Sequence, residues 1–222
     1  MLADDLHEAG ARSPITLTKL LLVEGKDQFY FFKALLRHLR VLETIEIRNY
    51  GGCEQLADYL NVLPAIDGFL DVTSMGIVQD AERDPASAFD AVRGALESAR
   101  SRHSSEPRWE RLSVPAEPIL KAGEAPTISV FLLPDANTAG MLEDLCLRSV
   151  QEDAALPCVE TYFTCLGDRQ VRLPANAAKA HLHAFLASRP KPDLLVGQAA
   201  EAGYFPWDSP AFQPVQQFLR AL

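Results

Sequence analysis

The chain has 222 residues, of which 48% are hydrophobic, and this composition predicts a globular protein with a sizeable buried core. Lysine and arginine number 21 against 30 aspartates and glutamates, so the formal net charge is −9. The chain therefore lacks the strongly basic balance that indicates nucleic-acid binding, although an acidic enzyme can bind phosphates where bound cations invert the local field.

Strand and helix patterns alternate through the first half of the chain. Continuous apolar runs predict buried strands, and apolar residues spaced like Phe31, Leu35 and Leu39 predict amphipathic helices. In chain order, the patterns predict a strand at 17–23, a helix at 27–40, a strand at 43–48, a helix after Gly51 and Gly52, a strand at 72–78 and a helix at 85–102. Residues 103–126 are predicted to hold a short hairpin or an inserted loop.

The second half of the chain adds one strand and several helices. A strand is predicted at 127–133, followed by helices at 141–151, 158–166 and 175–188 and by two short helical pieces. The alternation predicts an α/β fold of Rossmann-like type with a mostly parallel central sheet. The expected organisation is a flexible leader at 1–14, an α/β core at 15–155 and a helical C-terminal extension at 156–222 packed on that core.

Cysteine usage and the N-terminal segment predict a cytoplasmic protein. Cys53, Cys146, Cys158 and Cys165 form no CxxC pair and match no common zinc spacing. The opening "MLADDLHEAGARS" is polar and acidic, unlike a secretory signal. No apolar run approaches the roughly 20 residues that a membrane span needs, so we expect reduced thiols and no membrane partner.

Acidic residues gather where the predicted strands end. They are Glu24 after the first strand, Asp80, Glu82 and Asp84 after the third, and Asp135 after the fourth, with Glu143 and Asp144 in the next helix. Right-handed crossovers bring all strand-to-helix loops to one edge of a parallel sheet, where ligands bind in such folds. Asp80 and Glu82 would point the same way in an extended segment. Together with Glu24 they are expected to hold Mg²⁺ or Mn²⁺, which prefer oxygen ligands.

Several of these acids also have a purely structural explanation. Glu24 fits a helix cap or a solvated loop residue, and Asp84 before Pro85 fits an N-cap as well as it fits metal support. Glu143 near a helix start would complement the helix dipole, and Asp135 suits a turn. The residue types by themselves leave both the metal site and the cap-and-turn explanation open.

Two motifs in this order resemble the TOPRIM fold, the metal-binding domain of topoisomerases, primases and related nucleases. "VEGKDQ" follows the first strand and "GIVQDAERDP" ends a later one, whereas the family has a glutamate at the first position and Asp-x-Asp at the second. Glu24 matches the glutamate, and Asp80 matches the first aspartate. Glu82 stands in place of the second aspartate, which keeps a carboxylate but lengthens its reach.

Over nearly its full length the chain resembles DUF3226, a TOPRIM-like family of small bacterial proteins of unknown function. The matching pieces are "LLLVEGKDQFYFF", "GIVQDAERDP", "VFLLPDANTAGMLEDLCL", "KAHLHAFLAS" and the tail "GYFPWDSPAF" with "FLRAL". The resemblance implies relatives among OLD-family nucleases, in which a TOPRIM domain works with an ABC-type ATPase. Those nucleases also carry an acid in a later helix and a lysine further on, and Glu143 and Lys179 stand in the corresponding order here.

The resemblance and the acid pattern together predict Mg²⁺- or Mn²⁺-dependent hydrolysis of phosphodiesters in DNA or RNA, with a bacterial defence system as one setting. The expected metal ligands are Glu24, Asp80, Glu82, Asp84 and Glu143, the last two supporting a second metal. Glu24 would also act as a general base. Lys179 would stabilise the negative charge that develops on the phosphate.

Two other functions stay open at this point. The first is a non-catalytic TOPRIM-like module that acts as the partner of a separate ABC/AAA-type ATPase. The chain has no GxxxxGK[ST] motif, so such an ATPase would be another protein. The second is nucleotidyl or phosphoryl transfer of the kind that primases perform.

Overall fold

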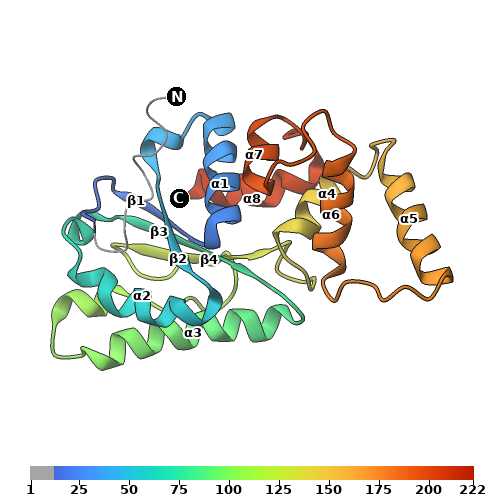
Figure 1. Ribbon diagram of the computed structural model, residues 1–222. Coiled ribbons are helices and arrows are strands. Elements are labelled where there is room, and N and C mark those ends of the chain that lie inside the picture. Colours follow the sequence, from blue (N-terminus) through green and yellow to red (C-terminus); the bar gives the residue numbers. More distant parts are fainter. Residues whose placement is uncertain (1–12) are drawn as a thin grey trace.

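A four-stranded parallel sheet forms the centre of the protein in a computed structural model that describes residues 13–222 (Figure 1). Its strands are β1 (Lys19–Glu24), β2 (Glu46–Gly51), β3 (Ser74–Asp80) and β4 (Thr127–Leu133), in the spatial order β2-β1-β3-β4. All three pairings are parallel, which confirms the predicted α/β class. Of the leader expected at 1–14, residues 1–12 lie outside the described residues.

Helices connect the strands and extend the chain beyond the sheet. They are α1 (Gly25–Leu39), α2 (Leu56–Val62), α3 (Pro85–Arg102), α4 (Leu142–Ser149), α5 (Leu156–Asp168), α6 (Ala177–Ala187), α7 (Val196–Glu201) and α8 (Gln213–Ala221). None of the helices between residues 13 and 222 combines the length and the apolar character needed to cross a membrane.

Most of the predicted elements are present, and the differences have local causes. Strand β2 begins three residues later than predicted because Leu42–Thr44 forms a 3₁₀ turn. Strand β3 is shifted by two residues toward the C-terminus, so Asp80 is its last residue. The segment 103–126 holds the 3₁₀ helix Pro107–Arg111 and a loop, in which Ala122 forms an isolated bridge with Ile128 at the outer edge of β4.

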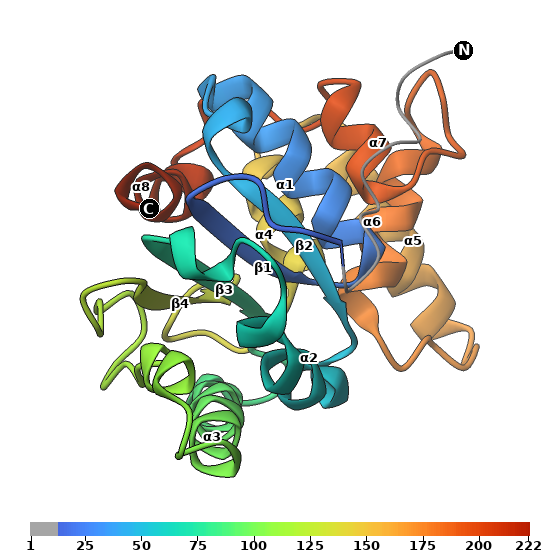
Figure 2. The same cartoon turned by 90° about the vertical axis from the view of Figure 1, so that its left-hand side faces the viewer.

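Two hydrophobic layers cover the two faces of the sheet, because alternate residues of each strand point to opposite sides. Leu21 and Val23 of β1 join a core formed with α1, α4, α7 and α8, and α6 packs behind α4. Leu20 and Leu22 of the same strand join a second core with α2 and α3. Figure 2 shows α2 and α3 on one side of the sheet and α1, α4 and α8 on the other.

The C-terminal helices complete the first of these layers. Phe218 of α8 lies 5.2 Å, between ring centroids, from Phe131 of β4. Gly76 in the middle of β3 makes room for this helix, because a Cβ there would lie 2.9 Å from Phe218 and 3.0 Å from Leu222. The predicted extension therefore packs directly on the sheet, as part of its main core.

The strand order creates a crevice at the carboxyl edge of the sheet. The chain passes from β1 outward to β2 and then returns to β3, which pairs with the other side of β1. The connections that follow β1 and β3 therefore leave the sheet toward opposite faces. In doubly wound folds, ligands bind at such a topological switch point.

Candidate functional site

A cavity of about 230 Å³ lies at this switch point, beside the carboxyl ends of β1 and β3. Four residues predicted from the sequence line it: Glu24, Asp80, Glu143 and Lys179. They come from the end of β1, the end of β3, the first turn of α4 and the first turn of α6. The tertiary structure thus brings together residues that lie up to 155 positions apart in the chain.

The turn that carries Glu24 is held by a neighbouring strand. Gly25 has φ +70°, a left-handed conformation that favours glycine and lets α1 start directly after β1. The Asn49 side chain of β2 accepts hydrogen bonds from the backbone N–H groups of Gly25 at 2.9 Å and of Gly51 at 2.8 Å. One amide oxygen therefore ties the β1–α1 turn to the end of β2.

The Glu24 side chain is oriented by a buried pair of polar residues. Gln79 donates from Nε2 to Glu24 Oε2 at 2.7 Å, and the Tyr50 hydroxyl lies 2.9 Å from Gln79 Oε1. Because a carboxylate only accepts hydrogen bonds, the contact assigns the nitrogen of Gln79 to the Glu24 side. Tyr50 reaches Gln79 because the β1–β2 register shifts here, pairing Val23 with Asn49 but Glu24 with Gly51.

Asp80 is the most perturbed carboxyl of the cavity. Burial, followed by the nearby charges of Glu24 and Glu143, raises the pKa of Asp80 to about 8. Its Oδ1 accepts a hydrogen bond from the backbone N–H of Leu142, at 3.0 Å, where α4 begins. At neutral pH the Asp80 carboxyl therefore keeps its proton unless a bound cation replaces that proton.

Glu143 of α4 and Lys179 of α6 form an ion pair between the two helices. Glu143 is 8% exposed in its side chain, and its Oε1 lies 3.7 Å from Nζ of Lys179, whose side chain is 53% exposed. Burial raises the pKa of Glu143, and the charge of Lys179 offsets part of this rise. Asn176 positions the lysine by capping α6, accepting the Lys179 backbone N–H at 2.9 Å.

The other predicted acids lie elsewhere. Asp84 caps α3 by accepting the Ser87 N–H at 3.0 Å, which is the structural explanation considered from the sequence. Asp135 accepts hydrogen bonds within its turn and pairs with Arg148 at 2.6 Å. Glu82 is exposed, and like Asp84 it does not line the carboxylate cavity.

Asp80 and Glu82 do not lie in one extended segment, which was the premise for expecting their side chains to point the same way. Strand β3 ends at Asp80, and Glu82 has φ +54° instead of an extended conformation. Its backbone pairs with Gly140, since Glu82 N–H donates to Gly140 O at 2.7 Å and Gly140 N–H returns a bond at 2.8 Å. This long-range bridge ends the two-residue alternation on which the expectation rested.

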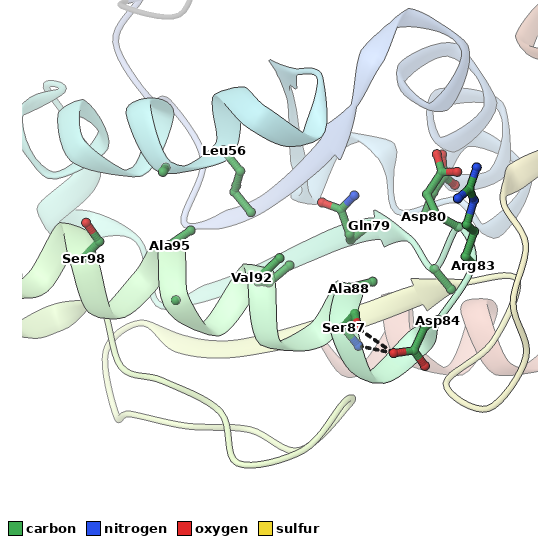
Figure 3. A pocket seen from close by; sticks show the side chains of 15 residues that line it. Leu56, Gln79, Asp80, Arg83, Asp84, Ser87, Ala88, Val92, Ala95 and Ser98 are labelled. Atoms are coloured by element: carbon green, nitrogen blue, oxygen red, sulfur yellow. Dashed lines mark hydrogen bonds between the residues drawn. The ribbon is translucent and has the colours of Figure 1, made fainter.

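Glu82 and Asp84 instead line a second, larger cavity of about 580 Å³ between α2 and α3. Figure 3 shows Asp80, Arg83 and Asp84 at one end of this groove, with Leu56, Ala95 and Ser98 toward the other. Asp80 and Gln79 line the groove, and Asp80 also lines the carboxylate cavity. The two cavities are therefore adjacent and meet at Asp80.

The donors of the carboxylate cavity suit a hard divalent cation in their chemistry. Glu24 and Glu143 both disfavour ionised Asp80, and a cation between them would relieve this repulsion. As the side chains of residues 13–222 stand, no three His, Cys, Asp or Glu residues surround a single metal position. Glu24 is engaged by Gln79 and Glu143 by Lys179, so joint coordination requires these two long side chains to rotate.

Sequence reasoning missed three polar residues of this region. Gln79 is 5% exposed and interrupts the apolar run of β3, a signal visible in "MGIVQD". Gln28 is 3% exposed and lies on the buried face of α1, three and four positions before Phe31 and Phe32. Tyr50 left no comparable signal, because its contact depends on the register shift between β1 and β2.

Comparison with known proteins gives one match. The model of the family described as a protein of unknown function, DUF3226, matches residues 18–222. No curated protein and no solved structure matches the chain. The matched range includes every residue of the carboxylate cavity.

Proposed function

The chain belongs to the DUF3226 family, and from the geometry of its carboxylate cavity we propose that it is a Mg²⁺- or Mn²⁺-dependent phosphodiesterase of TOPRIM type acting on DNA or RNA. One observation carries the proposal. Glu24, Asp80, Glu143 and Lys179, from four separate elements, line one cavity at the switch point of the sheet. An acidic cluster with lysines nearby, here Lys26 and Lys179, is suited to binding a cation and a phosphate together.

Each residue has a role that follows from its position. Glu24, Asp80 and Glu143 would hold the cation, which supplies positive charge against the charge developing on the phosphate oxygens. Lys179, half exposed beside Glu143, would face the phosphate. In hydrolysis the oxygen of water bonds to phosphorus as the ester P–O bond breaks. Glu24 would take the proton from that water, and solvent would protonate the leaving oxygen.

Cleavage of labelled single- and double-stranded DNA and RNA in Mn²⁺ tests the proposal. Asp80→Asn keeps the acceptor for the Leu142 N–H but removes the charge, so we expect it to abolish cleavage. It should also abolish the rise in melting temperature that Mn²⁺ causes in the wild type, because a ligand that binds only the folded state stabilises it.

Asp144→Asn is the matched control. Asp144 accepts the Met141 N–H at 2.9 Å and does not line the cavity, and asparagine can make the same cap. This variant should cleave like the wild type. Full cleavage activity in Asp80→Asn would refute the role of Asp80 as a metal ligand. Loss of cleavage in both variants would show that the substitutions disturb the fold around the carboxyl ends of the strands.

A second candidate is a non-catalytic module that acts as partner of a separate ABC/AAA-type ATPase in a defence system. The specific observation in its favour is that Gln79 and Lys179 already engage Glu24 and Glu143. These contacts stabilise the site without a cation. No Mn²⁺-dependent shift in melting temperature and no cleavage in the wild type would favour this function over the nuclease.

A further inference from the structure

One wall of the carboxylate cavity is formed by the start of α1 and the turn after β2. Gly25 and Gly52 line this wall, and the space where a Cβ would stand is open for 4 Å at both residues. A ligand can therefore approach the backbone closely at both turns. Helix α1 has 15 residues, and the Glu24 side chain does not cap its N-terminus. The positive end of a helix dipole favours an anion at such a position.

Gln28 supplies an independent observation at the same wall. Its Oε1 accepts the backbone N–H of Glu24 at 2.9 Å, which fixes the orientation of the amide group. Its Nε2 is buried and has no hydrogen-bond partner among residues 13–222. Gln28 itself lines the cavity and is 3% exposed. A buried amide donor without an acceptor disfavours the folded state, which points to an acceptor supplied by a ligand.

We propose that Gln28, through Nε2, and the glycine turns at Gly25 and Gly52 form an anion subsite that binds a non-bridging oxygen of the substrate phosphate. This inference rests on the proposed phosphodiesterase function and adds the residue that positions the phosphate. Four carboxylates line the same cavity, those of Glu24, Asp27, Asp80 and Glu143. These acids outnumber the two lysines of the cavity, Lys26 and Lys179, so a divalent cation should strengthen phosphate binding there.

The experiment compares melting temperatures in Mg²⁺ with and without millimolar inorganic phosphate. Gln28→Met keeps the length of the side chain but removes both the Nε2 donor and the oxygen that accepts the Glu24 N–H. Gln198→Met is the matched control, because Gln198 Oε1 accepts the Leu195 N–H at 3.0 Å at the start of α7 and does not line the cavity. Phosphate should raise the melting temperature of the wild type and Gln198→Met, and should leave Gln28→Met unchanged.

A second variant protects the test against misfolding. Gln28→Glu retains an acceptor for the Glu24 N–H but presents a negative charge in place of the donor, so it should also lose the phosphate-dependent shift. In cleavage assays, Gln28→Met should raise KM for an oligonucleotide about tenfold and change kcat little, the expected loss of one hydrogen bond to a charged group.

The outcomes separate this subsite from the proposed function. An equal phosphate-dependent shift in the wild type and Gln28→Met overturns the subsite, as does the absence of any shift in the wild type. Cleavage by the wild type with an unchanged KM in Gln28→Met also overturns it while the phosphodiesterase stands. A shift that depends on Gln28 in a protein that cleaves no nucleic acid supports the subsite and refutes the phosphodiesterase.

Discussion

At the scale of single residues, Glu24 is positioned by two buried side chains that do not line the carboxylate cavity. Gln79 and Tyr50 are 5% and 3% exposed, and together they hold one oxygen of the Glu24 carboxylate. Buried polar groups that orient a functional carboxylate usually matter almost as much as the carboxylate itself. The contact also explains the place of a glutamine in an otherwise apolar strand.

Tyr50→Phe tests this orientation. Loss of the hydroxyl frees the Gln79 amide to rotate, so we expect Mn²⁺ affinity and cleavage each to fall by about tenfold. The free energy of unfolding should fall by only about 1 kcal/mol, the usual cost of one hydrogen bond. The measurements are Mn²⁺ titration of the melting temperature and the cleavage rate.

Tyr59→Phe provides the control for that change. Tyr59 of α2 is similarly buried, at 5% exposed, but it does not line the carboxylate cavity. We expect the Mn²⁺ affinity of this variant to equal that of the wild type. Equal Mn²⁺ affinity in Tyr50→Phe would mean that the tyrosine serves only the packing of β2.

The raised pKa of Asp80 predicts a pH dependence of stability in metal-free buffer. The folded protein keeps the Asp80 proton up to a pKa of about 8, whereas the unfolded chain releases it near 3.8. Between these values the folded state binds more protons, so the free energy of unfolding falls as the pH rises. Asp80→Asn removes this decrease in the free energy of unfolding, because asparagine has no proton to release.

Urea unfolding in EDTA checks the sign of the Asp80 effect. The variant should be more stable than the wild type near pH 8, on the order of 2 kcal/mol after allowing for solvent screening. The difference should shrink as the pH falls and vanish below the unfolded pKa of 3.8, where Asp80 is protonated in both states. Parallel stability curves for the two proteins would show that Asp80 is not perturbed.

At the scale of elements, the crossing of α1 and α7 depends on a close backbone approach. A Cβ on Gly197 would lie 2.2 Å from Tyr30 Cβ and 3.0 Å from the Phe31 backbone nitrogen. The two helices therefore pack more closely here than any side chain on Gly197 would allow. Their contact joins the C-terminal part of the chain to the helix that begins at the cavity.

Gly197→Ala should lower the free energy of unfolding by about 1–3 kcal/mol, because the helices must separate to admit the methyl group. Gly94→Ala is the matched change within α3, where a Cβ would meet nothing within 4 Å. This control should be more stable by about 0.5–1 kcal/mol, because alanine favours a helix over glycine. Chemical denaturation of the two variants provides the comparison, and equal effects would contradict the close approach.

At the scale of the whole molecule, the two tryptophans report on the two layers. Trp109 is 3% exposed in the core with α2 and α3, and Trp207 packs against Phe31 and Phe212 in the core with α1. The sheet contributes side chains to both cores. Unfolding of one layer therefore removes support from the other.

We expect a single cooperative transition from both tryptophans. Trp109→Phe leaves Trp207 as the only tryptophan, and Trp207→Phe leaves Trp109. Fluorescence melts of the two variants should each coincide with the far-UV circular dichroism melt of the same variant. An earlier Trp207 transition would instead show that the C-terminal helices unfold as a separate domain.

The sequence by itself determined the α/β class and, to within two residues, the ends of the strands that carry Glu24 and Asp80. Hydrophobic periodicity is a local property, and an apolar run that stops at polar residues marks a strand end approximately. Glu143 and Lys179 were identified through the resemblance of motifs, which gave their order along the chain, and the structure then placed both at the same cavity.

Only the tertiary structure decided which acids share a cavity and what holds them. Glu82, whose backbone bridges to Gly140, does not line the carboxylate cavity that Asp80 lines, and Tyr50 contacts Gln79 beside the register shift between β1 and β2. Both depend on backbone pairing between segments far apart in the sequence. Such pairing sets the direction of a side chain beyond the end of a strand. The local sequence pattern does not predict this pairing.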